Sequence, residues 1–386
     1  MEETTVMFQL TPARSRLRRA AGVAAGTLMV AVVAAGCGSS SSSSSGSSAS
    51  SNSNVSAAQQ VVSQAMQRPG AITVSKPVGK TVPSGKKVAF ISCGVSVCQI
   101  QGQIVAQAAK ALGWSTSVVT TDGTPTSVQA AYDTAVRQGA NAIVTTAALR
   151  AEIASKLPAL QSKGIVVSNC CTTDPVAAPF IYNTSTPPQA AVGGKYLAAE
   201  IAADSKGKAN TLYVNIPAFN ILSSLGATLK SSYQQYCPKC GYASIDVSLT
   251  QLAKAPNLIV SYLRSHPSVN YVALSVANQL DNGLPAALAA AGLSHVKIVG
   301  QGGGPTDFQY VANGQELALV PFDYYSVDYQ MVDALARHFA GVPVQQTPPP
   351  MWLVTKANLP AAHSDLFPNV TGYQSQFMKL WGKTSA

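Results

Sequence analysis

The chain has 386 residues, of which only 11% are charged, and a formal net charge of +10. Its lysines and arginines are scattered singly instead of forming a dense basic stripe, which argues against a nucleic-acid partner. The length is enough for two domains of ordinary size.

Residues 1–36 are predicted to form a lipoprotein signal peptide. Several arginines between positions 14 and 19 precede the small apolar run 20–33, which is too short to span a bilayer. The next residues, Ala-Ala-Gly-Cys at 34–37, resemble the bacterial lipobox, in which the cysteine is lipidated. We therefore expect Cys37 to carry a lipid anchor in the cell envelope, outside the cytoplasmic membrane. A plain signal peptide with an incidental Cys37 is the alternative.

Residues 37–56 are rich in serine and are predicted to form a flexible tether. A serine tract cannot bury apolar surface, so we expect a coil that spans about 25 Å. Residues 57–85 are an expected lead-in segment, with a short helix-like piece near 57–67 and then loops that contain proline and glycine.

From Lys86 onward, apolar β-type runs alternate with amphipathic helical patterns that end at glycine. This alternation predicts an α/β fold of two lobes, each with a parallel sheet of about five strands covered by helices on both faces. We place lobe 1 at residues 86–184 and 323–350, and lobe 2 at residues 185–322 and 351–360. Residues 361–386 are a C-terminal tail whose apolar stripe, which includes Phe377 and Trp381, is expected to pack on a lobe.

The functional site of an open α/β sheet lies beyond the carboxyl ends of its strands. Two such lobes joined by a hinge place the site in the cleft between them. None of the histidines falls on a loop that follows a predicted strand, and no catalytic motif is found. The sequence therefore predicts a binding protein and not an enzyme, with no cofactor and no metal.

The chain has seven cysteines, and Cys37 leaves an even set, which in an exported protein favours disulfides over metal ligation. Cys237 and Cys240 have the spacing of a redox motif. They follow the end of an expected helix, however, so we favour a structural disulfide over catalysis. The other candidates lie on two cleft loops, and pairing within each loop or between the loops stays open: Cys93, Cys98, Cys170 and Cys171.

Several segments together resemble the type I periplasmic binding proteins, in the ribose-binding branch that serves sugar ABC importers. They are KKVAFIS at 86–92, RQGANAIV at 137–144, VKIVGQGG at 296–303 and WLVTKANL at 352–359, in this order and spacing. The resemblance covers roughly residues 86–360. It implies two Rossmann-like lobes joined by a three-segment hinge, and closure on a small molecule that is passed to an ABC permease.

The ligand contacts that the resemblance implies are altered in this chain. Val97 and Cys98 stand where sugar binders carry an asparagine and aromatic residues. Ser223 replaces an arginine, Gly302 an aspartate and Phe322 a glutamine, and an Asn-Asp pair is displaced to Asn278 and Asp281. The residues expected to bind the ligand are Val97, Cys98, Asn169, Phe219, Ser223, Asn278, Asp281, Gln301, Gly302, Phe322 and Tyr324.

These replacements bear on the ligand because each sugar hydroxyl buried without a partner costs about 1–3 kcal/mol. Phe219, Phe322 and Tyr324 offer apolar and stacking surface instead. We therefore expect a cyclic or aromatic ligand with fewer hydroxyls than a pentose or hexose. The alternative is that the alignment is displaced by a residue or two and a sugar still binds.

The sequence thus predicts a lipid-anchored, monomeric solute-binding protein of a sugar-type ABC importer. One alternative keeps the fold and makes the protein a sensor that presents its closed form to a membrane receptor. A second is an extracellular thiol oxidoreductase that uses Cys237 and Cys240.

Overall fold

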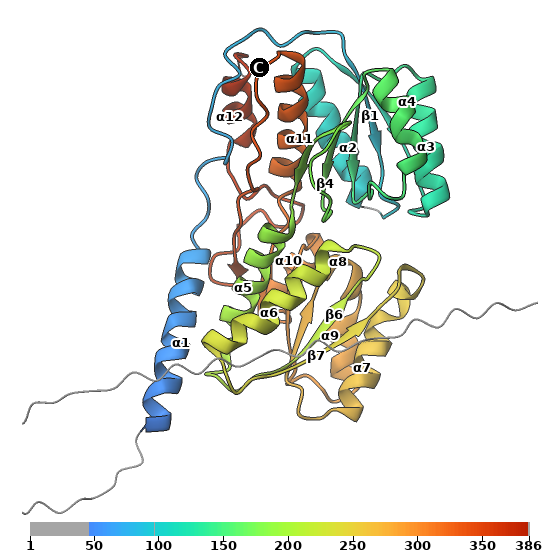
Figure 1. Cartoon of the computed structure of the whole chain (residues 1–386). Coiled ribbons are helices and arrows are strands. Elements are labelled where there is room, and N and C mark those ends of the chain that lie inside the picture. Colours follow the sequence, from blue (N-terminus) through green and yellow to red (C-terminus); the bar gives the residue numbers. More distant parts are fainter. Residues whose placement is uncertain (1–45, 96, 385–386) are drawn as a thin grey trace, which may run out of the picture. The chain divides into compact units, whose positions relative to one another are not determined.

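The computed structural model describes residues 46–95 and 97–384. The predicted signal peptide, Cys37 and the first part of the expected tether lie outside these residues. The described part contains two sheets with helices packed on them (Figure 1). This arrangement confirms the predicted class of two α/β lobes with mainly parallel sheets.

Lobe 1 is built from residues 87–184 and one later helix. Its elements are β1 (Lys87–Ile91), α2 (Val97–Ala111), β2 (Ser115–Val119), α3 (Pro125–Arg137), β3 (Ala142–Thr146), the 3-10 helix η1 (Ala154–Lys156), α4 (Leu157–Ser162), β4 (Val166–Cys170), β5 (Phe180–Thr184) and α11 (Tyr324–Phe339). The five strands lie in the order β2-β1-β3-β4-β5 and all neighbours are parallel. Residues of α2 and α11 pack on one face of the sheet and residues of α3 and α4 on the other, so β3 and β4 are buried throughout.

Lobe 2 follows the same plan with a larger sheet. Its elements are α5 (Pro187–Asp204), β6 (Asn210–Asn215), α6 (Ile221–Tyr236), β7 (Gly241–Asp246), the 3-10 helix η2 (Leu249–Lys254), α7 (Ala255–Ser265), β8 (Tyr271–Leu274), α8 (Ala277–Leu280), α9 (Leu284–Ala290), β9 (Lys297–Gln301), α10 (Pro305–Asn313), β10 (Ala318–Val320) and β11 (Val354–Thr355). The strand order is β11-β10-β9-β8-β6-β7, and every neighbouring pair is parallel except β10 and β11.

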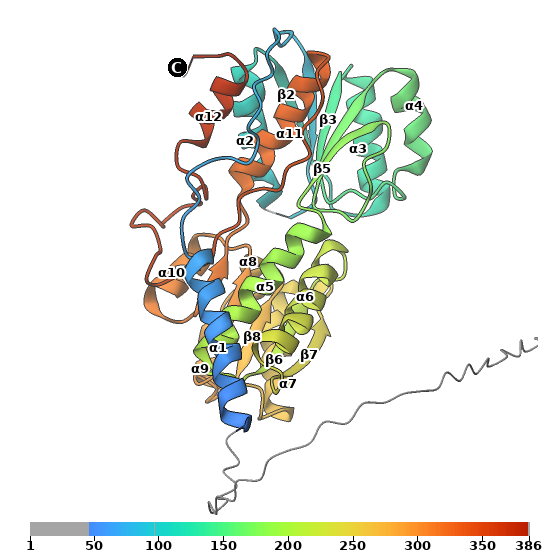
Figure 2. The same ribbon diagram turned by 60° about the vertical axis from the view of Figure 1, so that its left-hand side comes forward.

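The chain passes between the lobes at the three predicted places: between β5 and α5, between β10 and α11, and between α11 and β11. It also crosses at both ends of the described region. The helix α1 (Gly46–Ala65) contacts α5 and α6 of lobe 2, whereas Val74, Val78 and Val82 just after it are buried in lobe 1. The C-terminal helix α12 (Tyr373–Leu380) returns from β11 to α11 of lobe 1 (Figure 2).

The start of α1 differs from the expected coil, because helix covers residues 46–56 of the stretch interpreted as a tether. From Val55 the sequence places Ala58, Val62 and Ala65 at helical spacing on one face. Ala58 and Ala65 are buried in the core of lobe 2, with Val62 packed beside them. Tertiary packing of this apolar stripe, which composition alone does not reveal, stabilises the helix.

The C-terminal tail is fixed to lobe 1 through a buried ion pair. Arg337 Nε donates to Asp333 Oδ2 over 2.6 Å, and both side chains are almost fully buried. Trp381 of the tail donates to the other oxygen of Asp333 over 2.9 Å, and Arg337 also donates to the carbonyl of Lys76 in the lead-in segment. One ion pair therefore joins α11, the tail and the lead-in segment.

Among the described residues, none of the helices combines the length and the apolar character needed to cross a bilayer.

We expect Arg337→Met to lower the free energy of unfolding by about 3–5 kcal/mol, because it leaves the buried carboxylate of Asp333 without its cation. Urea unfolding of the purified protein measures the change. The matched control is Lys156→Met, which removes a partly exposed ion pair with Asp133 and should cost less than about 1 kcal/mol. Equal effects of the two substitutions would contradict this account of the tail.

Candidate functional site

A cavity of about 120 Å³ lies at the carboxyl ends of the strands and is lined by residues of both lobes. Its walls come from the loops after strands such as β1, β3, β6, β8 and β10, and from the first turns of α2, α5, α6 and α11. Residues 349–351 of the third interlobe segment complete the lining. This is the position that parallel sheets dictate for a ligand site.

Most side chains that line the cavity are apolar. Phe219, Ile221 and Leu222 contribute from lobe 2, and Phe322 and Met351 from interlobe segments. The ring of Phe322 also contacts that of Tyr324, with centroids 4.8 Å apart. Such walls suit the apolar face of a ligand and offer few partners to a molecule with a hydroxyl on every carbon.

Several residues that line the cavity carry a buried polar atom without a hydrogen-bond partner among the described residues. These atoms are Ser185 Oγ, Gln301 Oε1 and Asp323 Oδ2. A side chain at position 193 would bring its Cβ within 2.6 Å of Gln301 Oε1, so Gly193 of α5 leaves the space that this amide occupies. The cavity therefore combines apolar walls with a few directed polar groups.

Gln101 of α2 is a further polar residue of the cavity, and hydrogen bonds to two neighbouring side chains hold it in place. Its Nε2 donates to Asp328 Oδ1 over 2.9 Å, and Thr146 Oγ1 donates to its Oε1 over 3.4 Å. Asp328 is completely buried, and burial raises the pKa of this carboxyl well above its usual range. These contacts orient the Gln101 amide, which is itself 1% exposed.

Asp323 is the acidic residue of the lining. Its Oδ1 accepts the backbone N–H of Ser326 over 3.1 Å and so caps α11. Burial raises the pKa of Asp323 to about 6, although the hydrogen bonds from Ser326 and the charge of Arg68 each lower it. The second oxygen, Oδ2, is buried without a hydrogen-bond partner among the described residues.

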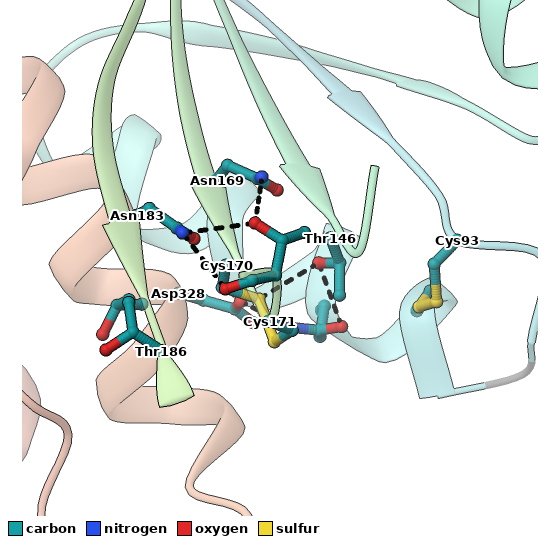
Figure 3. Close-up of a disulfide and its surroundings, with 12 residues drawn as sticks. Cys93, Thr146, Asn169, Cys170, Cys171, Asn183, Thr186 and Asp328 are labelled. Carbon is teal, nitrogen blue, oxygen red and sulfur yellow. Dashed lines mark hydrogen bonds between the residues drawn. A yellow bond between two sulfur atoms is a disulfide. The ribbon is translucent and has the colours of Figure 1, made fainter. Parts of the chain in front are cut away.

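The structure pairs the cysteines of each cleft loop with one another, Cys93 with Cys98 and Cys170 with Cys171 (Figure 3). Cys93, Cys98 and Cys171 all line the cavity, so sulfur forms part of its apolar wall. The structure brings the sulfur atoms within each loop together, and the disulfide pairing stays a prediction.

The asparagines that end two neighbouring strands hold the loop that carries Cys171. Asn169 and Asn183 both donate to Thr172 Oγ1, over 3.3 and 3.2 Å, and Asn183 also donates to the carbonyl of Asp174 over 2.8 Å. Asn169 is completely buried and does not line the cavity. The structure thus uses this predicted ligand residue to fix a loop.

The third pair, Cys237 and Cys240, lies at the opposite end of lobe 2. Cys237 caps the C-terminal end of α6, and Cys240 immediately precedes β7 at the amino end of the strands. Cys240 Sγ accepts the backbone N–H of Ala209 over 3.2 Å. The pair therefore joins a helix end to a strand start, away from the cavity.

The structure brings most of the predicted ligand residues together in the cavity: Val97, Cys98, Phe219, Gln301, Gly302, Phe322 and Tyr324. Ser223 is exposed on α6, because Leu222, Leu225 and Gly226 on neighbouring faces of the helix turn inward. Asn278 and Asp281 line a second cavity next to Asp307. Ligand contact by each of these residues stays a prediction.

Several polar residues of the cavity were not predicted: Gln101, Gln189, Gln279, Ser185 and Ser275. Gln101 could have been found, since it lies one helical turn after Val97 on the same face of α2. Gln189 also has a sequence signal, because it accepts the N–H of Thr186 in a capping box over 2.7 Å. Residues 349–351 carry no such signal, since only the path of the third crossing brings them to the site.

Asp281 and Asp307, which line the second cavity, form a group of buried acids with Glu316. Burial raises the pKa of Asp281 to about 11, and the charges of Glu316 and Asp307 add to this effect. Burial likewise raises the pKa of Asp307 and that of Glu316.

Comparison with known proteins agrees with this architecture. Residues 92–342 match a family model described as a periplasmic binding protein domain. No curated protein sequence matches the chain significantly.

Solved structures with low sequence identity share the fold. An ABC sugar transporter subunit from Rhodobacter sphaeroides is 21% identical with a TM-score of 0.62, and the match covers 71% of this chain and 99% of that one. A glucose-galactose binding protein from Geobacillus stearothermophilus is 19% identical with a TM-score of 0.63, and the match covers 72% of this chain and 100% of that one. The 5-methylthioribose transporter solute binding protein from Thermotoga lettingae, in complex with 5-methylthioribose, is 19% identical with a TM-score of 0.62. The match covers 80% of this chain and 96% of that one.

The raised pKa of Asp323 predicts a pH dependence of stability. The folded protein holds this proton more tightly than the unfolded chain. The contribution of the bound proton to the free energy of unfolding is therefore complete below about pH 4 and is lost as the pH rises through about 6. Asp323→Asn keeps an oxygen that can cap α11 and does not titrate. We expect the stability of this variant relative to the wild type to rise from about pH 4 to about pH 7, as measured by urea unfolding.

A control for this prediction is Asp122→Asn on an exposed loop, where hydrogen bonds from Thr124 lower the pKa of the carboxyl. Its stability relative to the wild type should not rise over the same range. A pH-independent difference between Asp323→Asn and the wild type would show that the Asp323 carboxyl is not buried as described.

Proposed function

The chain belongs to the periplasmic binding protein family, and we propose that it is the solute-binding component of an ABC importer for a small organic ligand. The cavity lined by both lobes carries this proposal. A ligand held there contacts both lobes at once, so its binding favours the closed arrangement. The transporter proteins that share the fold support the same role.

The ligand that we propose is a cyclic or aromatic compound with few hydroxyl groups. The apolar lining around Phe219, Phe322 and Met351 supports this choice. Polar recognition falls to a small set of groups, among them the amides of Gln101 and Gln301 and the carboxyl of Asp323. Each further hydroxyl placed against the apolar walls would lose its hydrogen bonds to water without replacement.

A structural relative illustrates a ligand of mixed character. The Thermotoga lettingae protein holds 5-methylthioribose, a sugar in which a thioether replaces one hydroxyl. Another relative, from Agrobacterium vitis, holds allitol, which has a hydroxyl on every carbon. The fold thus serves both kinds of ligand, and the lining of this chain favours the less polar kind.

We also propose that the protein is held outside the cytoplasmic membrane by a lipid on Cys37. The basic and apolar segments before this cysteine and the lipobox-like residues 34–37 support the proposal. The family is named for proteins of an extracytoplasmic compartment. Such a compartment favours persistent disulfides, in accord with the three cysteine pairs.

Cys237 and Cys240 are proposed to form a structural disulfide and not a redox centre. Their position at a helix end, at the amino end of the strands and away from the cavity, supports this interpretation. Thiol-specific labelling of the unreduced protein should leave both cysteines unmodified.

The proposed ligand class is tested by thermal unfolding of the purified, oxidised protein against a panel of compounds. The panel contains pentoses, hexoses, polyols, aromatic acids and alicyclic compounds. A ligand at a hundred times its Kd stabilises by about 2.7 kcal/mol, which raises Tm by several degrees. We expect such a rise with an aromatic or alicyclic compound, and a rise confined to simple sugars would contradict the proposed class.

Two matched phenylalanine substitutions test whether the ligand occupies this cavity. Phe322→Ala removes an aromatic wall and should reduce the ligand-induced rise in Tm. Phe339→Ala removes a ring of similar burial that packs against Trp114, outside the cavity, and should leave that rise unchanged. Equal ligand-induced rises in the two variants would place the ligand elsewhere.

The lipid anchor is tested with Cys37→Ser expressed in a bacterial host that processes lipoproteins. The wild-type protein should fractionate with membranes and carry added acyl mass by mass spectrometry. The variant should lose the acyl mass and be released from the membrane fraction. Identical fractionation and mass for the processed chains of both proteins would contradict the proposed anchor.

A further inference from the structure

Three carboxyl side chains meet in the interior of lobe 2. Asp281 follows α8, Asp307 lies in the first turn of α10, and Glu316 lies between α10 and β10. Their carboxylate oxygens come within 4.8 Å of one another. All three residues are at most 2% exposed.

These carboxyl groups have almost no partners. Asp307 Oδ2 accepts the backbone N–H of Gly304 over 2.6 Å. Both oxygens of Glu316, together with Asp281 Oδ2 and Asp307 Oδ1, accept no hydrogen bond from an N–H or O–H group of the described residues. None of the ion pairs found in this part of the chain involves the three acids.

Glu316 is the most unusual member. It is 1% exposed and does not line the second cavity, and yet its carboxyl group reaches both aspartates that do. A buried carboxylate with neither a cation nor a hydrogen-bond donor carries a desolvation cost of several kcal/mol. Two more carboxyl groups nearby increase that cost, so the cluster must either hold protons, as the raised pKa values indicate, or bind a cation.

The second cavity gives such a charge a path to the cluster. Asp281 and Asp307 line it together with Asn278 and Asn282 and residues 304–306. Asn278 Oδ1 is also buried and without a partner, which adds an amide oxygen near the acids. Oxygen atoms of these residues therefore face the space beside the apolar side chains of Val97, Ile100, Pro305 and Leu366.

We propose that Asp281, Asp307 and Glu316 bind a divalent cation, and that Ca²⁺ is the ion that best fits the cluster. Ca²⁺ binds six to eight oxygen ligands at about 2.3–2.6 Å, so two oxygens on one ion lie at most about 5 Å apart. The separations within the cluster meet this limit. Carboxylate and amide oxygens favour Ca²⁺ or Mg²⁺ over softer metals, and an irregular set from three separate segments suits the more flexible coordination of Ca²⁺.

The cation would stabilise the wall of the main cavity. Asp307 binds the backbone of Gly304, and Gly302, two residues earlier, lines that cavity. Asp281 and Glu316 add the turn after α8 and the approach to β10. The ion would thus hold together three segments of lobe 2, and this inference does not depend on the identity of the organic ligand.

The test is Ca²⁺ binding by the purified full chain after treatment with a chelator and its removal. Isothermal titration calorimetry should give one site, and about 5 mM Ca²⁺ should raise Tm by about 2 °C or more. Tb³⁺ offers a direct probe of the cluster. The charges of Asp281 and Glu316 act on Tyr310 of α10, so this tyrosine is near the cluster and should sensitise the emission of bound Tb³⁺. Excess Ca²⁺ should then quench that emission.

Two glutamate substitutions make the test specific. Glu316→Gln should abolish the Ca²⁺-dependent rise in Tm, and in chelator it should unfold at the wild-type temperature or above it, because one of three buried acidic groups is replaced by a neutral amide. Glu200→Gln changes a glutamate of α5 with 8% exposure outside the cluster and should keep the full rise. If Glu316→Gln does not fold, Asp281→Asn is used in the same comparison.

The wild-type protein alone can overturn the proposal. No heat, no rise in Tm and no Tb³⁺ emission would mean that the three carboxyl groups are held by shared protons without an ion. A rise in Tm that survives in Glu316→Gln would place the cation at another site. Either result rejects the proposed cluster and leaves the proposed transport function untouched.

Discussion

The parallel arrangement of the strands is the constraint on which the rest of the structure depends. In each lobe the strands that approach the cavity run in the same direction, so their carboxyl ends lie at one edge of the sheet. The loops at these edges supply the cavity lining from both sheets. The disulfide loops, the glycine run after β9 and the start of α11 are brought together only because of this polarity.

Within that frame, the balance of polar and apolar groups decides what the cavity can hold. Its walls are largely apolar, and few polar side chains line it. Hydrogen bonds to residues outside the lining orient such side chains, as Asp328 orients Gln101. Preorganised groups of this kind lose little entropy when a ligand binds. The buried carboxyl groups of Asp281, Asp307 and Glu316 lie in a different environment. There, buried acidic oxygens lack hydrogen-bond donors. We therefore propose different partners for the two sites, an organic molecule for one and a cation for the other.

The sequence predicted the fold because its signals are local. Apolar runs and glycine-terminated helices mark each strand and helix, and their alternation determines the parallel sheets. Residues at strand ends or in the loops after them, such as Phe219, Gln301 and Phe322, were selected in the same way. Asn169 follows the same rule and yet braces a loop, because its side chain is on the buried side of the strand end.

Other features depend on contacts between distant segments, which a single sequence does not specify. The serine-rich residues 46–56 continue a helix whose later part, with Ala58 and Ala65, packs on lobe 2. Glu316 has no motif around it, and it joins two aspartates only because three connections converge in lobe 2. Residues 349–351 reach the cavity because of the path that the chain takes between the lobes.

The central claim is that a weakly hydroxylated small molecule binds between the two lobes. Native mass spectrometry tests it most directly, with the protein first exposed to a complex metabolite extract and the retained compound identified after release. The account predicts one cyclic or aromatic compound with few hydroxyl groups, retained at one molecule per chain. Retention of a monosaccharide or a polyol would contradict it.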